Sequence, residues 1–581
     1  MLIKPNARLH GTQLAGWKPR STPGVRYEDI ILESDVGIPM PDGTVLRADT
    51  YRPRTGDKVP ALIAWTPYSK DIQNARVADE GGVVSYVASR GYAHVRIQAR
   101  GSGKSEGQRP PIFSSQEIGD VCDAIAWTAV QPWCDGSIGM IGASYLAMIQ
   151  YFAAARKPAP LKAIFPFLAS TDLYRDATKD GAVFNEFDTM IMYPISSKMK
   201  IEPPTLRHLL GYLLDSSFSS RLVYNHKALS KLGKLSGDYY RPDEASCREY
   251  VDFIFDQKYD GPFYTKRSAW SILSDIDIPV LIGINYTAIG FHYRGAFEAW
   301  HLLDTEKKLF IGPTAKVYIP WSEYQEELIA WYDYQLKGID NGYGDLPPVR
   351  YWLNGADEWR SAADWPIPGA EKRRFYLARS SSDVFDEHAL LCDEPAEETE
   401  LSYLSIPQHM VYIKEIERYE TQVLRYVSEP FDEDTEMTGP VKLRLLLSSN
   451  AIDTHIMVRV SDVAPNGSSR NLSWGWMQAA FRDIDERRST PSEVIHDCTL
   501  PRALTPGEPV TLEFTSTPMA NYFRKGHRLT LEVGARPDLL APSREDEIAF
   551  FNWHAPPYPA RNRIFHGGRE PSYMEVDIRQ G

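Results

Sequence analysis

The stretch QPWCDGSIGMIGASYLA, residues 131–147, decides the fold. Its apolar run Ile138–Ile141 has the length of a buried strand, and the residues from Tyr145 to about Ala155 are typical of a helix. Ser144 stands at the turn between them. A sharp strand-to-helix turn lifts a serine hydroxyl clear of the sheet, near the helix N-terminus, where backbone N–H groups favour developing negative charge. The stretch therefore predicts a nucleophile elbow with Ser144 as the nucleophile.

The residues around Ser144 follow only part of the G-x-S-x-G pattern of such an elbow. Gly142 and Ala143 are small, as a tight turn requires, but the fifth position is Leu146 instead of glycine. A Gly-x-Ser triplet alone usually marks no more than a turn. The prediction therefore depends on the strand before the triplet and the helix after it.

Strands and helices alternate in the same way in the first third of the chain and again after residue 270. Short apolar runs are followed by Gly, Pro or Ser and then by helix-like stretches. This alternation predicts an α/β fold, with a mostly parallel sheet covered by helices. The strand-sized runs are 61–65, 94–97, 138–141, 280–284 and 308–311.

The pattern changes between residues 172 and 270, where Leu, Tyr, Met and Phe recur at helical spacing. A helical insertion between core strands is a common way to cover a site, and a purely structural subdomain is the alternative. After residue 345 the apolar residues alternate with period two, which predicts an antiparallel β-sandwich of the jelly-roll type. We therefore expect an α/β core in 1–171 and 271–345, a helical cap in 172–270 and a C-terminal β-sandwich in 346–581.

The amino-acid composition bears on which kinds of molecule the protein binds. A formal net charge of −13, spread over 581 residues, gives no reason to expect nucleic acid or an anionic membrane as a partner. The five cysteines form no CxxC and no Cys/His cluster, which favours reduced thiols in a cytoplasmic protein over disulfides or a metal site. We see neither a signal peptide nor a membrane span. We expect a small-molecule substrate and no cofactor, and a homo-oligomer is left open.

Eight segments, spread over nearly the whole chain, carry a resemblance to a known family. They are Trp65-Thr-Pro-Tyr-Ser69, Arg100-Gly-Ser-Gly-Lys-Ser-Glu-Gly107, Gln131-Pro-Trp133, Gly142-Ala-Ser-Tyr-Leu146, Tyr332-Asp-Tyr-Gln-Leu-Lys-Gly338, Pro347-Pro-Val-Arg-Tyr351, Asp434-Thr-Glu-Met-Thr-Gly-Pro440 and Phe523-Arg-Lys-Gly-His-Arg528. In this order they resemble the CocE/NonD family of α/β-hydrolases, which is related to X-prolyl dipeptidyl peptidases. The resemblance implies an α/β-hydrolase core, an inserted helical cap and a C-terminal β-sandwich.

The resemblance also implies roles for individual residues. In that family a serine hydrolyses esters or amides through an acyl-enzyme, and a tyrosine hydroxyl and a backbone N–H form the oxyanion hole. Carried over, Ser144 is the nucleophile, Tyr68 the hydroxyl donor and the N–H of Tyr145 the second donor. A phenol O–H directed at a tetrahedral oxyanion is a physically reasonable stabiliser.

The chain departs from the family at the acid and the base. Thr287 stands where the acid is expected, and no carboxylate lies between Asp277 and Glu298. Lys316 occupies the position of the family's histidine. Because serine needs a base to become nucleophilic at neutral pH, these losses bear directly on the activity.

Two residues are candidates for the missing base. Lys316 would need its pKa lowered by roughly three units from the ordinary value of about 10.4, which burial under the cap could supply. If Lys316 stays charged, it could instead polarise a carbonyl. His292, in the loop after the strand 280–284, is the second candidate, although a histidine beside aromatic residues more often only packs.

Three hypotheses follow. The first is a hydrolase or acyltransferase that acts on an ester, thioester or amide through Ser144. The second is a converted enzyme, a cyclase, isomerase or lyase in a biosynthetic pathway, that uses Tyr68 and Lys316 to bind and polarise a carbonyl. The third is an inactive binder of small molecules. The substrate-binding side chains that we expect are Trp65, Tyr68, Tyr145, Tyr286, Thr287 and Phe291.

Overall fold

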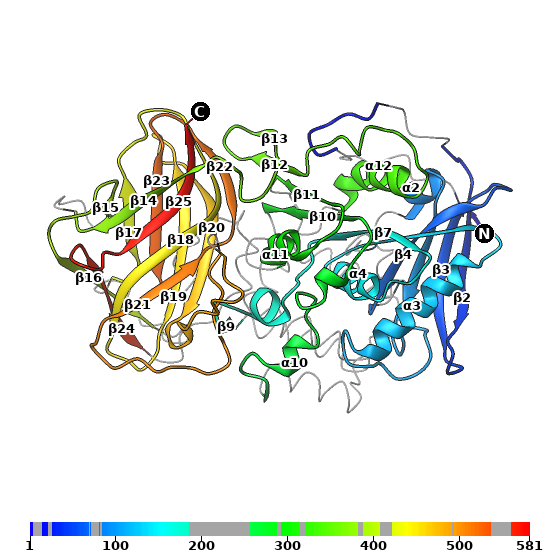
Figure 1. Ribbon diagram of the computed structural model, residues 1–581, viewed down its shortest axis with the longest axis horizontal. Coiled ribbons are helices and arrows are strands. Elements are labelled where there is room, and N and C mark those ends of the chain that lie inside the picture. The colour runs from blue at the N-terminus through cyan, green and yellow to red at the C-terminus, as the bar shows by residue number, and fades with distance from the viewer. Residues whose placement is uncertain are drawn as a thin grey trace, which may run out of the picture.

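The computed structural model describes residues 1–3, 14–20, 26–68, 70, 81, 84–184, 256–286, 292–313, 321–380, 387–406, 421–490, 493–535 and 559–580. Two β-rich bodies lie side by side in the molecule (Figure 1). The N-terminal body contains one mixed sheet with helices on both faces, and the C-terminal body is made of strands.

The N-terminal sheet has 11 strands in the order β1-β2-β3-β5-β4-β6-β7-β10-β11-β12-β13. The strands from β5 to β12 in this order run parallel, and antiparallel strands close both edges. Their bounds are β1 (Leu2–Ile3), β2 (Ile30–Pro39), β3 (Val45–Pro53), β4 (Val59–Thr66), β5 (Ala93–Gln98), β6 (Cys134–Ala143), β7 (Leu161–Phe167), β10 (Val280–Asn285), β11 (Lys307–Gly312), β12 (Val349–Leu353) and β13 (Glu358–Ala362).

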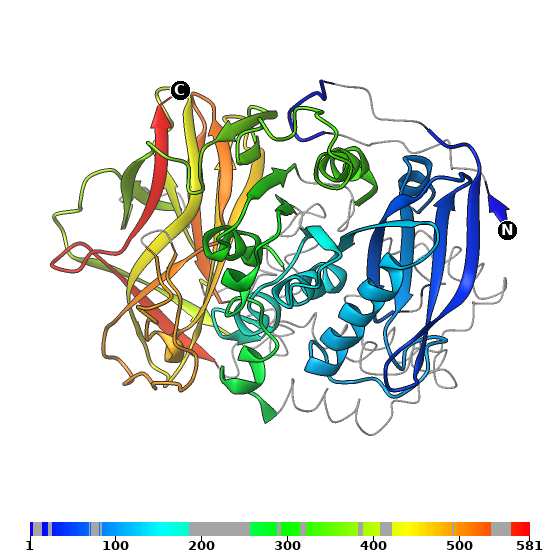
Figure 2. The ribbon, with the colours of Figure 1, turned by 45° about the vertical axis from the view of Figure 1, so that its right-hand side comes forward.

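Helices cover this sheet on both faces. The helices α2 (Val84–Ser89) and α12 (Gln325–Gln335) contact each other on one face, and α3 (Ser115–Ala129) and α4 (Tyr145–Ala155) contact each other on the other face (Figures 1 and 2). A further helix, α11 (Arg294–Leu302), packs on β10 and β11. The predicted α/β core is therefore confirmed.

The parallel strands explain where a site can form. β4, β6, β7 and β10 are neighbours, and their carboxyl ends meet at one edge of the sheet. In open α/β sheets, ligands bind in the crevice outside the carboxyl ends of the strands. Tyr68, Ser144, Ser170 and His292 follow these four strand ends in turn.

The C-terminal body contains 12 strands joined by hydrogen bonds in one sheet. All pairs are antiparallel except β15 with β17. The bounds are β14 (Glu371–Ala378), β15 (Glu387–Leu391), β16 (Thr399–Ser405), β17 (Leu424–Ser428), β18 (Thr435–Ser449), β19 (His455–Val463), β20 (Ser469–Gln478), β21 (Val510–Thr515), β22 (Met519–Phe523), β23 (Arg528–Gly534), β24 (Ala560–His566) and β25 (Tyr573–Gln580).

The long strand β18 pairs with β21, β22, β24 and β25, so the sheet closes around one apolar core. Alternate residues of β18 point into that core, including Val441, Leu443, Leu445 and Leu447. This is the period-two alternation from which a β domain was predicted, and the C-terminal β domain is confirmed.

The N-terminal sheet and the predicted domain limits differ at one boundary. Strands β12 and β13 add to the N-terminal sheet, so that sheet extends to Ala362, beyond the boundary predicted at residue 345. The alternation of apolar and polar residues in a strand does not show which of two sheets that strand joins. Much of the predicted cap, 185–255, lies outside the described residues.

The described part of the predicted cap and the remaining short elements complete the fold. They are the π-helix η1 (Leu173–Thr178), the hairpin β8 (Lys179–Asp180) with β9 (Val183–Phe184), α10 (Pro262–Thr265), and the 3-10 turns η3 (Leu273–Asp275), η5 (Trp321–Tyr324) and η7 (Ala479–Phe481). Within the part of the chain that the structure describes, no helix is long and apolar enough to cross a membrane.

A buried ion pair ties α12 to the sheet and to the N-terminal segment. The Glu327 carboxylate accepts from Arg350 Nη2 at 2.6 Å and from the Tyr343 hydroxyl at 2.5 Å. Its other oxygen accepts from the Ala15 N–H and from Trp17 Nε1, both at 2.9 Å. Because the pair is buried, both charges depend on each other for solvation.

We predict that Glu327→Ala lowers the free energy of unfolding by about 3–5 kcal/mol, because it leaves the Arg350 guanidinium buried without its carboxylate. Glu358→Ala is the control. Glu358 pairs with Arg360 at the surface, and its loss should change the free energy by less than about 1 kcal/mol. Denaturant unfolding measures both values, and equal effects of the two substitutions would contradict the prediction.

Candidate active site

The structure places Ser144 in the predicted strand-to-helix turn. Strand β6 ends at Ala143 and helix α4 begins at Tyr145, while Ser144 between them has φ 57° and ψ −123°. Gly142 has φ +150°, and a Cβ atom there would lie 2.4 Å from the Cβ of Leu146. Leu146 thus fills the space beside a residue without a side chain. The elbow therefore keeps its shape without the second glycine of the usual pattern.

His292 lies directly at Ser144. The Oγ of Ser144 and the Nε2 of His292 are 2.8 Å apart, which is hydrogen-bonding distance. His292 stands in the loop between β10 and α11, one position before Tyr293, and it is only 1% exposed. Of the two predicted bases, His292 is therefore the one that the described residues bring to the serine.

The second ring nitrogen of His292 contacts Ser170, which follows β7. His292 Nδ1 and Ser170 Oγ are 2.5 Å apart, and the Ser170 hydroxyl also donates to the backbone carbonyl of Asp176 at 3.5 Å. A hydroxyl that donates to a carbonyl offers its lone pairs to other groups. This arrangement favours the tautomer in which Nδ1–H donates to Ser170, so that Nε2 can accept the proton of Ser144.

Asp176, in η1, connects the segments that carry Ser170 and His292. Its backbone carbonyl also accepts from the His292 N–H at 3.4 Å. Its carboxylate accepts from the N–H groups of Arg294 and Gly295, at 3.0 and 2.9 Å, in the first turn of α11. A carboxylate at a helix N-terminus satisfies amides that have no partner inside the helix. Asp176 thereby fixes the helix that follows His292.

Gly295 permits a close approach of α11 to the loop after β7. A Cβ at Gly295 would lie 2.4 Å from the Ala169 carbonyl oxygen and 2.7 Å from the Thr171 nitrogen. These two residues flank Ser170. A larger residue at 295 would therefore separate the loop of Ser170 from the helix after His292.

Backbone strain concentrates around these residues. Ser144, His292, Leu168 and Phe113 have φ between 52° and 60°, a region that residues with side chains rarely adopt. Leu168 lies two residues before Ser170, and the Phe113 ring stacks on Tyr145 with centroids 4.6 Å apart. Such strained residues cluster at functional sites because the surrounding structure must hold them.

Burial determines the charge of His292. Loss of solvation lowers the pKa of its imidazole well below the ordinary value, because the charged form is disfavoured away from water. The neutral ring is the form that can accept a proton from Ser144. Burial therefore keeps His292 in the form of a base at neutral pH.

A buried carboxylate lies behind the elbow. Glu117, on α3, accepts from the Tyr145 hydroxyl at 2.8 and 2.9 Å, from Trp65 Nε1 at 3.1 Å and from the Phe113 N–H at 2.8 Å. Burial raises the pKa of Glu117. The carboxylate joins the residue after Ser144 to the end of β4, and it thereby holds the elbow against the neighbouring strand.

The structure shows where two of the predicted substrate-binding side chains lie. Trp65 and Tyr286 were expected to contact a substrate, but both are buried in the core. The Trp65 indole donates to Glu117, and the Tyr286 hydroxyl donates to the Trp352 carbonyl at 2.9 Å. Trp65 sits within β4, and Tyr286 directly follows β10. Both aromatic side chains therefore support the site from inside the protein.

Tyr68 lies beside Tyr145, the residue that follows Ser144. Its ring contacts the Tyr145 ring edge-on, with centroids 6.4 Å apart, and its N–H donates to Thr66 Oγ1 at 3.0 Å. Lys70, two residues later, is buried and lies 2.8 Å from a carboxylate oxygen of Asp35 and of Asp49. Lys70 thus anchors the segment that carries Tyr68.

Three predicted site residues lie outside the described residues, namely Thr287, Phe291 and Lys316. Their predicted roles stay predictions. Two residues of the site were not predicted, namely Ser170 and Asp176. The only signal for them in the sequence is their place after a strand that was itself not predicted, since β7 (Leu161–Phe167) contains a lysine and a proline.

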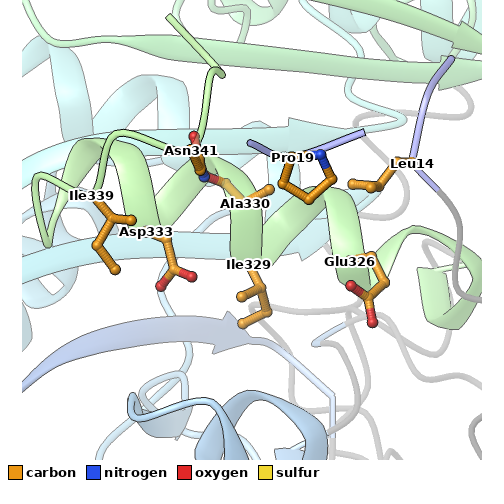
Figure 3. A pocket seen from close by; sticks show the side chains of 8 residues that line it. All are labelled: Leu14, Pro19, Glu326, Ile329, Ala330, Asp333, Ile339 and Asn341. Carbon is orange, nitrogen blue, oxygen red and sulfur yellow. The ribbon is translucent and has the colours of Figure 1, made fainter. Parts of the chain in front are cut away.

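Other hollows in the molecule lie apart from Ser144. One, of about 20 Å³, follows α12 and is lined by Leu14, Pro19, Glu326, Ile329, Ala330, Asp333, Ile339 and Asn341 (Figure 3). Another, of about 720 Å³, lies between the ends of α3 and α4 and residues 265–275. Phe113, whose ring stacks on Tyr145, is one of the residues that line it.

Two family models of known proteins match most of the chain. Residues 42–318 match the family model of the X-Pro dipeptidyl-peptidase (S15 family), and residues 341–575 match that of the X-Pro dipeptidyl-peptidase C-terminal non-catalytic domain. Cocaine esterase of Rhodococcus sp. (strain MB1 Bresler) is 25% identical, over 94% of this chain and 98% of that protein. A putative serine esterase of Mycobacterium bovis is 24% identical, over 88% and 90%.

Solved structures share the fold over almost the whole chain. A CocE/NonD family hydrolase from Staphylococcus aureus has a TM-score of 0.75 and 21% identity, covering 95% of this chain and 94% of that one. An α-amino acid ester hydrolase has a TM-score of 0.70 and 17% identity, covering 95% and 97%. The chain belongs to the CocE/NonD family of α/β-hydrolases. Within that family it is a serine-hydrolase-like enzyme of the esterase and peptidase type.

We predict that Ser170→Ala slows the reaction of Ser144 with a fluorophosphonate about 5- to 150-fold. Loss of one buried hydrogen-bond partner costs about 1–3 kcal/mol, and the substitution removes the group that fixes the His292 tautomer. Ser268→Ala is the matched control, because this buried hydroxyl bonds to Leu173 and Tyr264. Intact-mass kinetics measure both rates. Equal rates in the two variants would contradict the prediction.

The direction of the His292 pKa predicts the pH profile of the same reaction. Because burial lowers this pKa, the imidazole stays neutral at pH 7, and the rate should be level from pH 9 to pH 7. It should fall only at lower pH, with a midpoint below the ordinary histidine value of about 6.5. A rate that instead rises between pH 7 and pH 9 would indicate Lys316 as the base.

Proposed function

We propose that this protein hydrolyses carboxylic esters through an acyl-enzyme on Ser144, with His292 as the general base. The observation that carries the proposal is the 2.8 Å separation of Ser144 Oγ and His292 Nε2 at the strand-to-helix turn. A nucleophile and a base within 2.6–3.2 Å, with the base held by a third group, are the signature of an activated serine. Ser170 is the third group here.

The reaction proceeds in two halves. His292 takes the proton of Ser144 as Oγ attacks the ester carbonyl, and it returns that proton to the leaving alcohol. The carbonyl oxygen becomes an oxyanion near the N-terminus of α4, where the Tyr145 N–H and the Tyr68 hydroxyl stabilise it. A water molecule then gives its proton to His292 and attacks the acyl group, which releases the acid and restores Ser144.

A neutral orienting group distinguishes this site from a Ser-His-Asp triad. A carboxylate beside the imidazole stabilises the imidazolium that forms in the transition state, whereas a serine hydroxyl only fixes its tautomer and direction. We therefore expect a weaker base than in a carboxylate triad. Esters and thioesters, whose leaving groups depart more readily than an amine, are the substrates that such a base serves best. Relatives named as esterases support the same choice.

The Ser144–His292 contact weakens the case for the other hypotheses. Conversion to a cyclase, isomerase or lyase was argued from the loss of the family's base at Lys316 and acid at Thr287. Because His292 lies at the nucleophile and can act as the base, Lys316 is not needed in that role. We keep cytoplasmic location as part of the proposal, because the four described cysteines, Cys122, Cys134, Cys392 and Cys498, are all free thiols.

The proposal is tested by labelling the protein with a small fluorophosphonate and measuring its intact mass. We expect one phosphonyl group per chain, located on Ser144 by peptide mapping. Ser144→Ala should abolish the label, and His292→Ala should slow it by roughly 10⁴-fold or more, since nucleophile and base act as a unit.

His301→Ala is the matched control, because His301 lies on α11 after His292 and should leave the rate unchanged. The same variants are then assayed with p-nitrophenyl esters. Unchanged labelling in folded His292→Ala would refute the role of His292. No labelling of the wild-type protein between pH 6 and pH 9 would refute acyl-enzyme chemistry altogether.

A further inference from the structure

We infer that the C-terminal β domain positions the base, and that Arg488 of this domain is the positioning residue that joins the loop of Ser170 to the helix after His292. The inference rests on the proposed function, because it assigns His292 the role of base. It gives an active-site role to a domain whose family model is described as non-catalytic.

Arg488 reaches from the β domain into the N-terminal body and bridges two carboxylates. Its Nη1 lies 2.9 Å from the carboxylate of Asp172, and its Nη2 pairs with Glu298. Asp172 follows Ser170 by two residues, and Glu298 lies on α11, six residues after His292. The guanidinium also stacks on Trp270, 4.1 Å from the ring centroid. One side chain thus contacts both segments that hold the His292–Ser170 pair.

Other contacts from the same domain fix the backbone next to these residues. The Tyr293 hydroxyl donates to the Pro518 carbonyl at 2.8 Å, and Arg294 Nη2 donates to the Thr515 carbonyl at 2.7 Å. Tyr293 and Arg294 directly follow His292. On the other side, Arg175 donates from Nη2 and Nε to the His496 carbonyl, at 2.7 and 3.1 Å. Arg175 precedes Asp176, whose carbonyl accepts from Ser170 and from the His292 N–H.

Arg488 neutralises the two carboxylates between which it lies, Asp172 and Glu298. Asp172 is buried and Glu298 is half-buried, Arg488 lies between their carboxylates, and Thr171 Oγ1 donates to Glu298 at 2.6 Å. Burial raises the pKa of Glu298, and the neighbouring Asp172 charge acts in the same direction. Burial alone would raise the pKa of Asp172 as well, but Arg175 and Arg488 lower it. Without Arg488, Asp172 keeps Arg175 as its ion-pair partner, whereas Glu298 loses the guanidinium that lowers its pKa and faces the Asp172 charge across this joint.

Repulsion at this joint acts on the site itself. The loop 170–172 and helix α11 meet at Gly295, where no side chain separates them. If the loop and the helix move apart, the 2.5 Å contact between Ser170 Oγ and His292 Nδ1 lengthens, because one residue lies in that loop and the other directly before the helix. The imidazole then loses its fixed direction toward Ser144, while the elbow and Tyr68 remain in place. Loss of Arg488 should therefore impair proton transfer more than substrate binding.

The experiment uses the full chain with three variants, Arg488→Ala, Arg488→Lys and Arg487→Ala. Arg487 is the matched control, because its side chain is 91% exposed and its one ion pair among the described residues is with Asp485 in the same turn. Labelling of Ser144 is measured over a range of fluorophosphonate concentrations. Hydrogen exchange is followed by mass spectrometry in peptides that cover 168–178 and 292–302.

We expect Arg488→Ala to lower the maximal labelling rate about 10- to 100-fold, with little change in the probe concentration that gives half of it. Arg488→Lys should fall between Arg488→Ala and the wild type, since an ammonium keeps the charge but cannot bridge both carboxylates bidentately. Exchange should rise in the two peptides, and Arg487→Ala should behave as the wild type.

The outcomes separate the two proposals. If the wild type labels at Ser144 and Arg488→Ala labels at the same rate, the positioning role is wrong and the proposed function stands. If Arg488→Ala does not fold, a wild-type rate in Arg488→Lys overturns the need for a bridging guanidinium. If the wild type does not label at all, the proposed function fails, and the role of Arg488 fails with it.

Discussion

The contact of Ser144 Oγ with His292 Nε2 at 2.8 Å is the interaction on which the rest of the site depends. Ser144 stands in an elbow with a positive φ, and His292, which follows a different strand, has a positive φ as well. The two meet only because β6 and β10 both end at one edge of the sheet, with β7 between them. The α/β architecture therefore does more than support the serine. It determines which loops can supply a base.

The proposed base lies in the loop after β10, and the group that contacts its second ring nitrogen follows β7. The family places its acid after the strand that corresponds to β10, and this chain places His292 in that region instead. Ser170, after β7, contacts His292 Nδ1, and in our proposal it orients the imidazole. A hydroxyl fixes the tautomer without adding charge, which agrees with a deeply buried imidazole whose pKa is lowered.

The sequence predicted the elements whose signals are local. The strand 138–141, the turn at Ser144 and the helix from Tyr145 were all visible in one short stretch, and the structure has them where they were expected. Leu146 in place of glycine did not mislead, because Gly142 alone provides the space that the turn needs. Period-two alternation likewise indicated the C-terminal β domain, because it reflects one buried and one exposed face of each strand.

The features that failed depend on contacts between distant segments. The contact of Ser170 with His292 was not predicted. The two residues are more than a hundred positions apart, and no pattern near Ser170 indicates that a histidine lies beside it. Trp65 looked like a pocket residue, but a buried carboxylate on α3 draws its indole into the core. The predicted boundary at residue 345 left β12 and β13 out of the N-terminal sheet. The residues of β12 do not show that this strand pairs with β11, because the pairing depends on how the whole sheet is assembled. The roles of Thr287 and Lys316 remain predictions.

The most direct test of the central claim is a crystal structure of the protein after reaction with a fluorophosphonate. We expect phosphorus bonded to Ser144 Oγ, with His292 Nε2 within about 3 Å of Oγ or of the leaving-group oxygen position and Nδ1 still on Ser170. The non-bridging oxygen should point to the Tyr145 N–H. An adduct at Ser144 with Lys316 in contact and His292 turned away would contradict the account, and so would an adduct on any other residue.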